Sequence, residues 1–423
     1  MHLTTTFVLL VSFILLGVHA ELIAVLQIFR HGQRTPINFY PNDPYKDPSY
    51  WGGLAGGQLT NVVRHGQRIP VKFFPTSKYL DGEYWGNLGA GQLTNEGKRQ
   101  LFALGQYTRR RYPNFLPLKY NASSFHAYTT DVDRTHMSAQ SNIYSLFPAT
   151  DEQVWRRNLN WQPIPIHPIS RDEFWGDSAC PNFYILRTEA LNDKLSQSID
   201  EEYAGVYKYI SKYSGLDIKS YFQIHTVFDN FKIQEDVGLP LPDWSKAVYP
   251  EPITSIAGWL FEVFSRTTQM KRLIKGRFLN KVVEYFEKMA DDPKSSEKYQ
   301  FYSGHDSNIA SLLNSFGSFN PPYPPDFAST VYIELHFESW RHVVKVFSKD
   351  GDNVKQISVN GCSLSCPLSK FKEVLSDILI DKETYDEECS NIKDTSGLKK
   401  LLLADSNTHK ITTEEVRETS FIT

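Results

Sequence analysis

Residues 22–29, Leu-Ile-Ala-Val-Leu-Gln-Ile-Phe, form a nearly continuous apolar run that ends abruptly at Arg30. A strand with this pattern has no polar face, so it must be covered on both sides, as the inner strands of mainly parallel sheets are. The polar segment Arg-His-Gly-Gln-Arg-Thr-Pro follows at 30–36, where the edge of an open α/β sheet binds ligands. The run therefore predicts an α/β fold with a mainly parallel sheet flanked by helices.

The polar heptapeptide is part of an internal repeat. It recurs at 64–70 as Arg-His-Gly-Gln-Arg-Ile-Pro, and the match extends to Gly-Gln-Leu-Thr-Asn at 57–61 and 91–95. Two copies are too few to bury the continuous core of a solenoid. We interpret residues 62–95 as a tandem duplicate of 28–61, either a real gene product or two mutually exclusive exons joined end to end.

The surroundings of the two copies differ. Only the first follows a long apolar run, because the second is preceded by polar residues and just two valines. Only the second is followed by a helical pattern, which covers 95–111 with Thr94 as its N-cap and Pro113 beyond its end. We therefore expect one strand-loop-helix unit that takes its strand from the first copy and its helix from the second. The surplus second copy would be displaced into the loop.

The rest of the chain alternates between strand and helix patterns. We predict an α/β domain from residues 21–155 and 265–423, with a smaller, mostly helical insertion at 156–264. Strands are expected at 125–130, 299–302, 331–337 and 342–347, and helices at 190–205, 261–289, 309–316 and in a stretch that ends near residue 145.

The first twenty residues have the pattern of a signal peptide. An apolar run at 7–16 is followed by Val18-His19-Ala20, which places small residues before the cleavage point. The run is shorter than the roughly 20 residues that a membrane-spanning helix needs. We expect a secreted, extracellular glycoprotein without a stable membrane anchor, and Asn-Ala-Ser at 121–123 is its one glycosylation sequon.

Export makes disulfides the favoured use of the four cysteines. Three pairings are open; in one of them Cys362 and Cys366 close a small loop and leave Cys180 to reach Cys389. A zinc site is the competing interpretation, but the spacing lacks paired Cys-x-x-Cys units and a nearby histidine pair.

The motif at 30–36 has the chemistry of a phosphate site. Arg30 and Arg34 place two planar guanidinium groups beside a glycine that lets an anion approach the backbone, and arginine can bind two phosphate oxygens at once. Neighbouring arginines disfavour the cationic form of His31, so a ring nitrogen stays free to attack phosphorus.

Two further segments can complete such a reaction. Asp306 follows His305 at the end of another predicted strand, where it is a candidate general acid. His305 and Arg134 would donate hydrogen bonds to the phosphoryl oxygens. Taken singly, these residues are more often surface or salt-bridge groups, and the heptapeptide is what makes the functional interpretation favoured.

Together these segments resemble the histidine acid phosphatase family, in its secreted animal branch of insect venom and prostatic-like enzymes. The resemblance rests on 30–36, on Thr-Asp-Val-Asp-Arg-Thr at 130–135 and on Gly-His-Asp at 304–306, and it covers nearly the whole mature chain. It implies a phosphoglycerate-mutase-like fold, the disulfides Cys180–Cys389 and Cys362–Cys366, and chemistry without a metal or other cofactor.

The resemblance also implies roles for individual residues. His31 would form the phosphohistidine, Asp306 would donate the proton, and the phosphate would be held by Arg30, Arg34, Arg134 and His305. The fold has room for one copy of the motif, and we choose His31 over the duplicate His65 because only His31 follows a buried strand.

The expected function is hydrolysis of phosphate monoesters by an acid phosphatase. The alternatives are a phytase-like or phospholipid phosphatase, and an inactive secreted binding protein blocked by the duplicated segment. The formal net charge of −3 and the pI near 6.5 favour no nucleic-acid partner. The expected partners are small phosphorylated substrates, and a homodimer is the assembly considered.

Overall fold

The structure, a computed structural model, describes residues 21–30, 36–37, 68–79, 88–174, 180–292 and 297–391. The predicted signal peptide lies outside these residues, as do His31, Arg34 and His65. Within the described ranges, no helix combines the length and the hydrophobicity needed to cross a bilayer.

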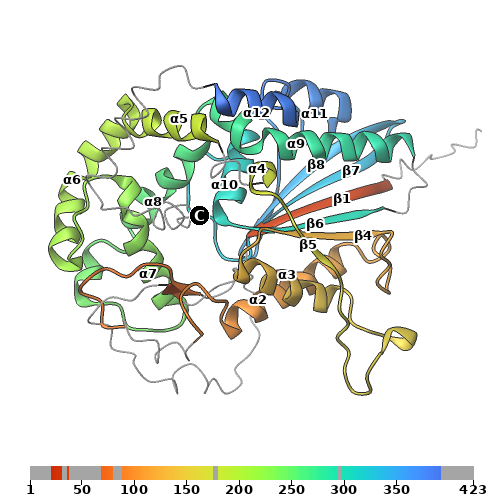
Figure 1. The fold of residues 1–423 in the computed structure, drawn as a ribbon, viewed down its shortest axis with the longest axis horizontal. Coiled ribbons are helices and arrows are strands. Elements are labelled where there is room, and N and C mark those ends of the chain that lie inside the picture. The colour runs from red at the N-terminus through yellow and green to blue at the C-terminus, as the bar shows by residue number, and fades with distance from the viewer. Residues whose placement is uncertain are drawn as a thin grey trace, which may run out of the picture.

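A twisted mixed sheet forms the centre of the molecule (Figure 1). Its order in the described residues is β10-β8-β7-β1-β6-β4-β5, with β9 paired to β8. Strands β1, β6, β4 and β5 are parallel to one another, whereas the β7 to β10 side is antiparallel. The strands are β1 (Glu21–Arg30), β4 (Phe125–Thr129), β5 (Ile166–Pro168), β6 (Tyr299–Gly304), β7 (Thr330–Glu338), β8 (Arg341–Asp350), β9 (Asn353–Ile357) and β10 (Cys366–Pro367).

Strand β1 is the buried inner strand that its apolar run predicts. It pairs with β6 on one side and with β7 on the other, and its side chains alternate between two cores. Leu26 and Ile28 belong to the larger core and Val25 to the smaller one. The one polar residue in the run, Gln27, is buried with its amide bonded to the hydroxyls of Tyr299 and Tyr332. The run can therefore be covered on both faces without an unpaired polar group.

Helices cover both faces of the sheet. Helices α2 (Asn95–Arg111) and α3 (Asp133–Leu146) lie on one face, and α9 (Thr268–Asp291), α11 (Leu368–Val374) and α12 (Lys382–Ser390) lie on the other (Figure 1). The predicted α/β class with flanking helices is confirmed. Helix α2 has the predicted bounds, and the Thr94 hydroxyl accepts a hydrogen bond from the Gly97 N–H at 3.2 Å.

A group of helices gathers beyond one end of the sheet (Figure 1). It consists of α5 (Pro181–Leu191), α6 (Lys194–Ser214), α7 (His225–Asp236) and α8 (Ile253–Glu262), while α4 (Arg171–Phe174) and α10 (Asp306–Ser315) lie closer to the strands. These helices fall largely within the predicted insertion, whose bounds stay a prediction. The predicted strands and the helix at 309–316 correspond to β4, β6, β7, β8 and α10.

Two predicted helices are interrupted. The helix expected at 190–205 is split at Asp193, which caps α6 by accepting a hydrogen bond from the Ser196 N–H at 2.8 Å. The helix expected at 261–289 is split before α9, which the Thr267 hydroxyl caps in the same way. Both predictions were wrong in continuity, because a local cap satisfies backbone donors and starts a new helix regardless of apolar spacing.

The two copies lie next to the expected elements: β1 ends in the first copy, and α2 begins at the last residue of the second. Residues 71–79 of the second copy are turns and irregular structure, and the segment 68–79 is packed against the rest of the molecule. Ile69, Phe74 and Tyr79 are buried there, and Phe74 packs edge-on against Phe231 and Trp244. A short parallel pair, β2 (Pro36–Ile37) with β3 (Ile69–Pro70), joins the copies.

Both disulfides implied by the family resemblance are present. Cys180 pairs with Cys389 and ties the start of α5 to α12 across 209 residues of sequence. Cys362 pairs with Cys366, at a sequence separation of 4, and closes a small loop before α11. The disulfide prediction is confirmed over the zinc alternative.

A buried charge on β7 joins the sheet to the end of α2. The Glu334 carboxylate accepts hydrogen bonds from Arg111 Nη2 at 2.7 Å and from the Tyr112 hydroxyl at 2.6 Å, and it lies 2.8 Å from His336 Nε2. Burial opposes the ionisation of Glu334, but the hydrogen bond from His336 and the charge of Arg111 outweigh it and lower the pKa of this carboxyl.

Because its folded-state pKa is lowered, Glu334 contributes stability above its unfolded pKa of about 4.3, and this contribution is lost as the pH falls through the folded value. We expect Glu334→Gln to lower the free energy of unfolding by about 2–4 kcal/mol at pH 7. The difference from wild type should narrow toward pH 3 in urea unfolding curves. The control is Glu338→Gln. Glu338 lies on β7 like Glu334 and pairs with Lys345 of β8, and its replacement should have a smaller effect on the free energy of unfolding. An equal loss at both pH values would contradict this role of Glu334.

Candidate active site

Three adjacent parallel strands end side by side. In the register of the sheet, Arg30 of β1 lies opposite Gly304 of β6, and Ser303 of β6 lies opposite Thr129 of β4. The chain leaves β6 into His305 and leaves β4 into Thr130, and the Thr130 N–H bonds to the Ser303 carbonyl at 3.1 Å. The three segments singled out in the sequence therefore emerge at one edge of the sheet.

His305 is completely buried at this edge. Its Nε2 lies 2.9 Å from the Thr130 hydroxyl, and its Nδ1 lies 3.4 Å from Arg134 Nη2 in the first turn of α3. Because a guanidinium can only donate, Nδ1 must be the acceptor in this contact. The proton of the neutral ring then sits on Nε2 and is donated to Thr130. A histidine and an arginine are thus held together at the point where β4 and β6 end.

The backbone at His305 is fixed by a small relay. The His305 N–H donates to Asn308 Oδ1 at 2.8 Å, and Asn308 Nδ2 donates to the Phe174 carbonyl at 3.0 Å. Gly304 has no room for a side chain, because a Cβ there would lie 2.6 Å from the Phe174 ring and 2.7 Å from Asn308 Oδ1. The glycine therefore allows the close packing that sets the direction of His305 and Asp306.

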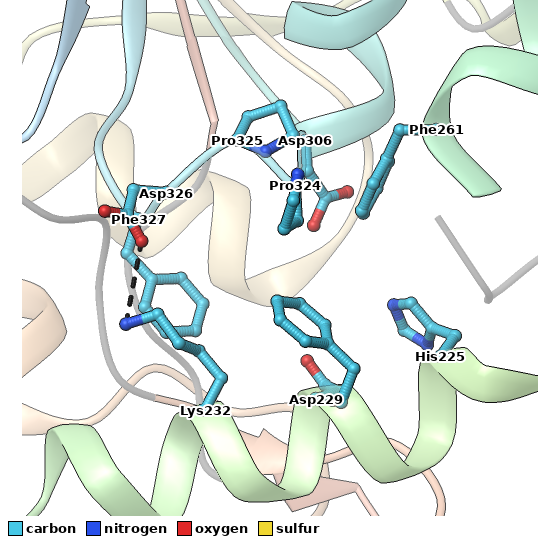
Figure 2. A pocket seen from close by; sticks show the side chains of 10 residues that line it. His225, Asp229, Lys232, Phe261, Asp306, Pro324, Pro325, Asp326 and Phe327 are labelled. Carbon is cyan, nitrogen blue, oxygen red and sulfur yellow. Dashed lines mark ion pairs between the residues drawn. The ribbon is translucent and has the colours of Figure 1, made fainter. Parts of the chain in front are cut away.

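Asp306 is the first residue of α10 and reaches a small pocket with a cavity volume of about 20 Å³, within a larger space that includes open solvent. Figure 2 shows its carboxyl group on one side of the pocket, near Phe261 and Pro324, with α7 on the opposite side carrying His225, Asp229 and Lys232. The full lining is His225, Phe228, Asp229, Lys232, Phe261, Asp306, Pro324, Pro325, Asp326 and Phe327. A buried acid thus faces a cavity whose walls combine phenylalanine and proline side chains with charged ones.

The charged groups of this lining are mostly acidic. It contains the three carboxyl groups of Asp229, Asp306 and Asp326 and a single lysine, Lys232. Lys232 is already paired with Asp236 at 2.6 Å and lies 3.6 Å from Asp326. The described walls therefore offer little excess positive charge to a polyanion.

Arg68 is a buried charge that the sequence interpretation missed. It belongs to the second copy of the heptapeptide, is 2% exposed and forms an ion pair with Asp229. Burial lowers the pKa of Arg68, while the charges of Asp229 and Asp306 act to raise it. Its Nε and Nη1 have no hydrogen-bond partner among the described residues. Each such unpaired group costs about 1–3 kcal/mol of stability in a site without a ligand.

The residues predicted for the site divide into two groups. Arg134, His305 and Asp306 are brought together, and the backbone of Arg30 lies beside Gly304 at the end of β1. His31, Arg34 and His65 lie outside the described residues. The available sequence signal for Arg68 was its position as the second arginine of the duplicate motif.

Comparison with known families agrees with this arrangement. The profile described as "Histidine phosphatase superfamily (branch 2)" matches residues 21–349. The chain belongs to this superfamily. The match includes both copies of the heptapeptide and all three strands that end at the site, so the predicted family is confirmed.

The relatives of this histidine phosphatase include several acid phosphatases. Human prostatic acid phosphatase is 30% identical over 89% of this chain and 90% of its own length. Lysosomal acid phosphatase of Rattus norvegicus is 31% identical over 88% of this chain and 81% of its own. Venom acid phosphatase Acph-1 of Apis mellifera is 26% identical, with coverages of 89% and 92%.

Solved structures support the fold. The apo form of Hafnia alvei phytase superimposes with a TM-score of 0.58 over 88% of this chain and 98% of its own. Its sequence identity is 14%, so the likeness concerns the arrangement of helices and strands.

The packing around Gly304 yields a prediction for this histidine phosphatase. We expect Gly304→Ala to lower kcat/KM for p-nitrophenyl phosphate by about tenfold or more, because the added Cβ must displace Phe174 or Asn308 and so misplace His305. Gly205→Ala is the matched control, since a Cβ there meets nothing within 4 Å and should not reduce activity. If Gly304→Ala keeps the kcat/KM of the wild type, the hydrogen bonds from His305 through Asn308 to Phe174 do not position the site.

Proposed function

We propose that this chain is an acid phosphatase that hydrolyses phosphate monoesters through a phosphohistidine on His31. The observation that carries the proposal is the junction of three strand ends, where the segment that continues into His31 meets Arg134, His305 and Asp306. An anion-binding edge with a buried acid facing a small cavity suits phosphoryl transfer, because the reaction needs charge stabilisation on the phosphoryl oxygens and a positioned proton donor.

In the proposed first step, a ring nitrogen of His31 attacks phosphorus and the bond to the ester oxygen breaks. Asp306 donates its proton to the departing alkoxide, so the alcohol leaves neutral. Asp306, now a carboxylate, then removes a proton from water as the water oxygen attacks the phosphohistidine. Inorganic phosphate leaves and His31 is free again.

The phosphoryl oxygens need donors on several sides while charge is shared between the entering and leaving groups. We assign this role to Arg30 and Arg134, with Arg34 as a further predicted ligand. His305 joins them when its ring carries a second proton on Nδ1, because its Nε2 already faces Thr130. Arg134 and His305 approach from neighbouring strand ends and are buried, so their donors are shielded from water. In the absence of substrate, the contact between Arg134 and His305 partly occupies these donors and acceptors.

The pocket in front of Asp306 favours an apolar or aromatic leaving group. Phe228, Phe261, Pro324, Pro325 and Phe327 supply its apolar surface. An inositol polyphosphate would place several further phosphates against walls whose charged groups are mainly carboxylates. This argument, together with the acid phosphatase relatives, favours a general monoesterase over the phytase-like alternative.

The inactive binding protein is the alternative from another functional class. Among the described residues, the second copy contributes a buried arginine beside the small space that faces Asp306. Most of the duplicated region lies outside the described residues, so turnover of p-nitrophenyl phosphate is the measurement that separates the two functions.

We also propose that the protein passes through an oxidising compartment and is secreted. The two disulfides agree with such a compartment, and release from the cell rests on the predicted signal peptide. The relatives include a prostatic, a venom and a lysosomal acid phosphatase. We propose the extracellular destination over the lysosomal one. The homodimer stays a prediction.

The choice between the two motif histidines can be tested directly. We expect His31→Ala to reduce kcat for p-nitrophenyl phosphate by about 10³-fold or more, because it removes the nucleophile, and to abolish a covalent phosphoryl label in rapid-quench experiments. His65→Ala should retain both turnover and label. The reverse result would assign the nucleophile to the second copy, and activity in both variants would refute the phosphohistidine.

The acid role of Asp306 predicts a dependence on the leaving group. We expect Asp306→Asn to slow hydrolysis of an alkyl phosphate about 10²-fold or more, but to slow p-nitrophenyl phosphate much less, because p-nitrophenolate departs without a proton. Wild-type kcat/KM should be highest at acidic pH, where a carboxylic acid is protonated. Equal losses for both substrates, or a rate that rises steadily toward alkaline pH, would contradict this role.

A further inference from the structure

The pocket in front of Asp306 lies between two walls that come from different parts of the chain. Helix α7 supplies one wall, which carries Phe228, Asp229 and Lys232. The loop between α10 and β7 supplies the other wall with residues 324–327. The distance between α7 and this loop therefore sets the room for the leaving group that takes the proton of Asp306.

Each wall is fastened to its own surroundings. Asn230 of α7 donates from Nδ2 to the Lys72 carbonyl at 2.9 Å. In the loop, the Asp326 N–H donates to Asp350 Oδ1 at the end of β8 at 3.1 Å. These contacts support the two walls separately, so a contact across the pocket joins two supported elements.

Lys232 makes such a contact. Its ammonium group lies 2.6 Å from Asp236 Oδ1, one turn further along α7, and 3.6 Å from Asp326 Oδ1 on the opposite wall. The same nitrogen lies 5.8 Å from the centre of the Phe327 ring. The Lys232 side chain is 15% exposed and that of Asp326 is 25% exposed, so solvent and salt screen their charges only in part. We call the Lys232–Asp326 ion pair the cross-pocket bridge.

The cross-pocket bridge stands at one side of the pocket. Figure 2 shows it opposite His225 and Phe261, with the carboxyl group of Asp306 between the two sides. Because the cavity volume is only about 20 Å³, a leaving group beside Asp306 contacts both walls, and a wide one must push them apart. Separating the walls would leave partly buried charges with weaker pairing, which is unfavourable.

We propose that the cross-pocket bridge limits the width of the leaving group, so that this enzyme prefers phosphate monoesters with a single ring over those with a fused ring system. The inference rests on the proposed function and deepens it by naming the preferred class of leaving group. Lys232 and Asp326 are positioning residues in this arrangement, because they hold the walls and take no part in the proton transfer or in the attack on phosphorus.

The test compares kcat/KM for phenyl phosphate and 1-naphthyl phosphate, whose leaving groups have similar acidity but different width. We expect wild type to prefer phenyl phosphate by about tenfold or more. Asp326→Asn and Lys232→Met should each reduce this preference by about fivefold or more, mainly through a lower KM for the naphthyl ester, because the walls then separate more easily. The double variant should reduce it no further, since both changes break one ion pair.

Two variants serve as controls. Asp326→Glu keeps a negative charge opposite Lys232 and should retain most of the preference. Lys345→Met removes a pair of similar exposure, with Glu338, that joins β7 to β8 outside the described lining of the pocket, and it should leave the preference unchanged. A purely structural role of the bridge would lower the melting temperature and kcat/KM for both esters alike, without changing their ratio.

An unchanged preference in folded Asp326→Asn and Lys232→Met would overturn the inference, and so would a wild type that hydrolyses both esters equally well. Lys232→Met also removes the partner of Asp236 and is the variant at greater risk of not folding. In that case Asp326→Asn carries the comparison alone, because it leaves the contact between Lys232 and Asp236 in place.

Binding measurements separate this inference from the proposed function. If wild type hydrolyses neither ester, the proposed function fails. Benzylphosphonate and 1-naphthylmethylphosphonate contain a carbon–phosphorus bond that is not hydrolysed, so their dissociation constants still compare a narrow group with a wide one. We expect Asp326→Asn to tighten binding of the naphthyl compound relative to the benzyl compound by about fivefold or more. Equal ratios in wild type and Asp326→Asn, or no binding of either compound, would overturn the inference.

Discussion

The site depends on the parallel register of β1, β6 and β4. The register brings the carboxyl ends of the three parallel strands level, so Arg30, Gly304 and Thr129 bring three distant parts of the chain to one edge. The register itself depends on the burial of β1 between two cores, because a shift by one residue would exchange Val25 with its neighbours and move side chains to the wrong core. Hydrophobic burial therefore positions the polar site.

The polar groups at this edge are supported by contacts that leave little freedom. His305 is held by Thr130, Arg134 and the Asn308 relay, and Gly304 admits the Phe174 ring against the backbone. Such packing places donors before substrate arrives, so less reorganisation is needed during phosphoryl transfer. The disulfide between Cys180 and Cys389 links the start of α5 to α12, which lies on the same face of the sheet as α9 (Figure 1).

Much of the fold follows from local patterns. The run at 22–29 predicts the inner strand, and the Thr94 cap predicts the start of α2, because burial and capping are decided by residues close in sequence. The same patterns fail at 190–205 and 261–289, where apolar spacing continues across the caps Asp193 and Thr267. Periodicity reports which face is buried, and it does not report where one helix stops and another begins.

The sequence by itself determined the family, the inner strand that leads into the heptapeptide, and the identity of Arg134, His305 and Asp306 as candidates. These candidates stand in short motifs, at 130–135 and 304–306, that lie between a strand pattern and a helix pattern. Only the tertiary structure decided what the second copy does. The burial of residues 68–79 and the pairing of Arg68 with Asp229 depend on α7, which is far away in sequence. The two heptapeptides differ only in Thr35 and Ile69, so their own residues do not predict the burial of Arg68, which depends on packing against distant residues.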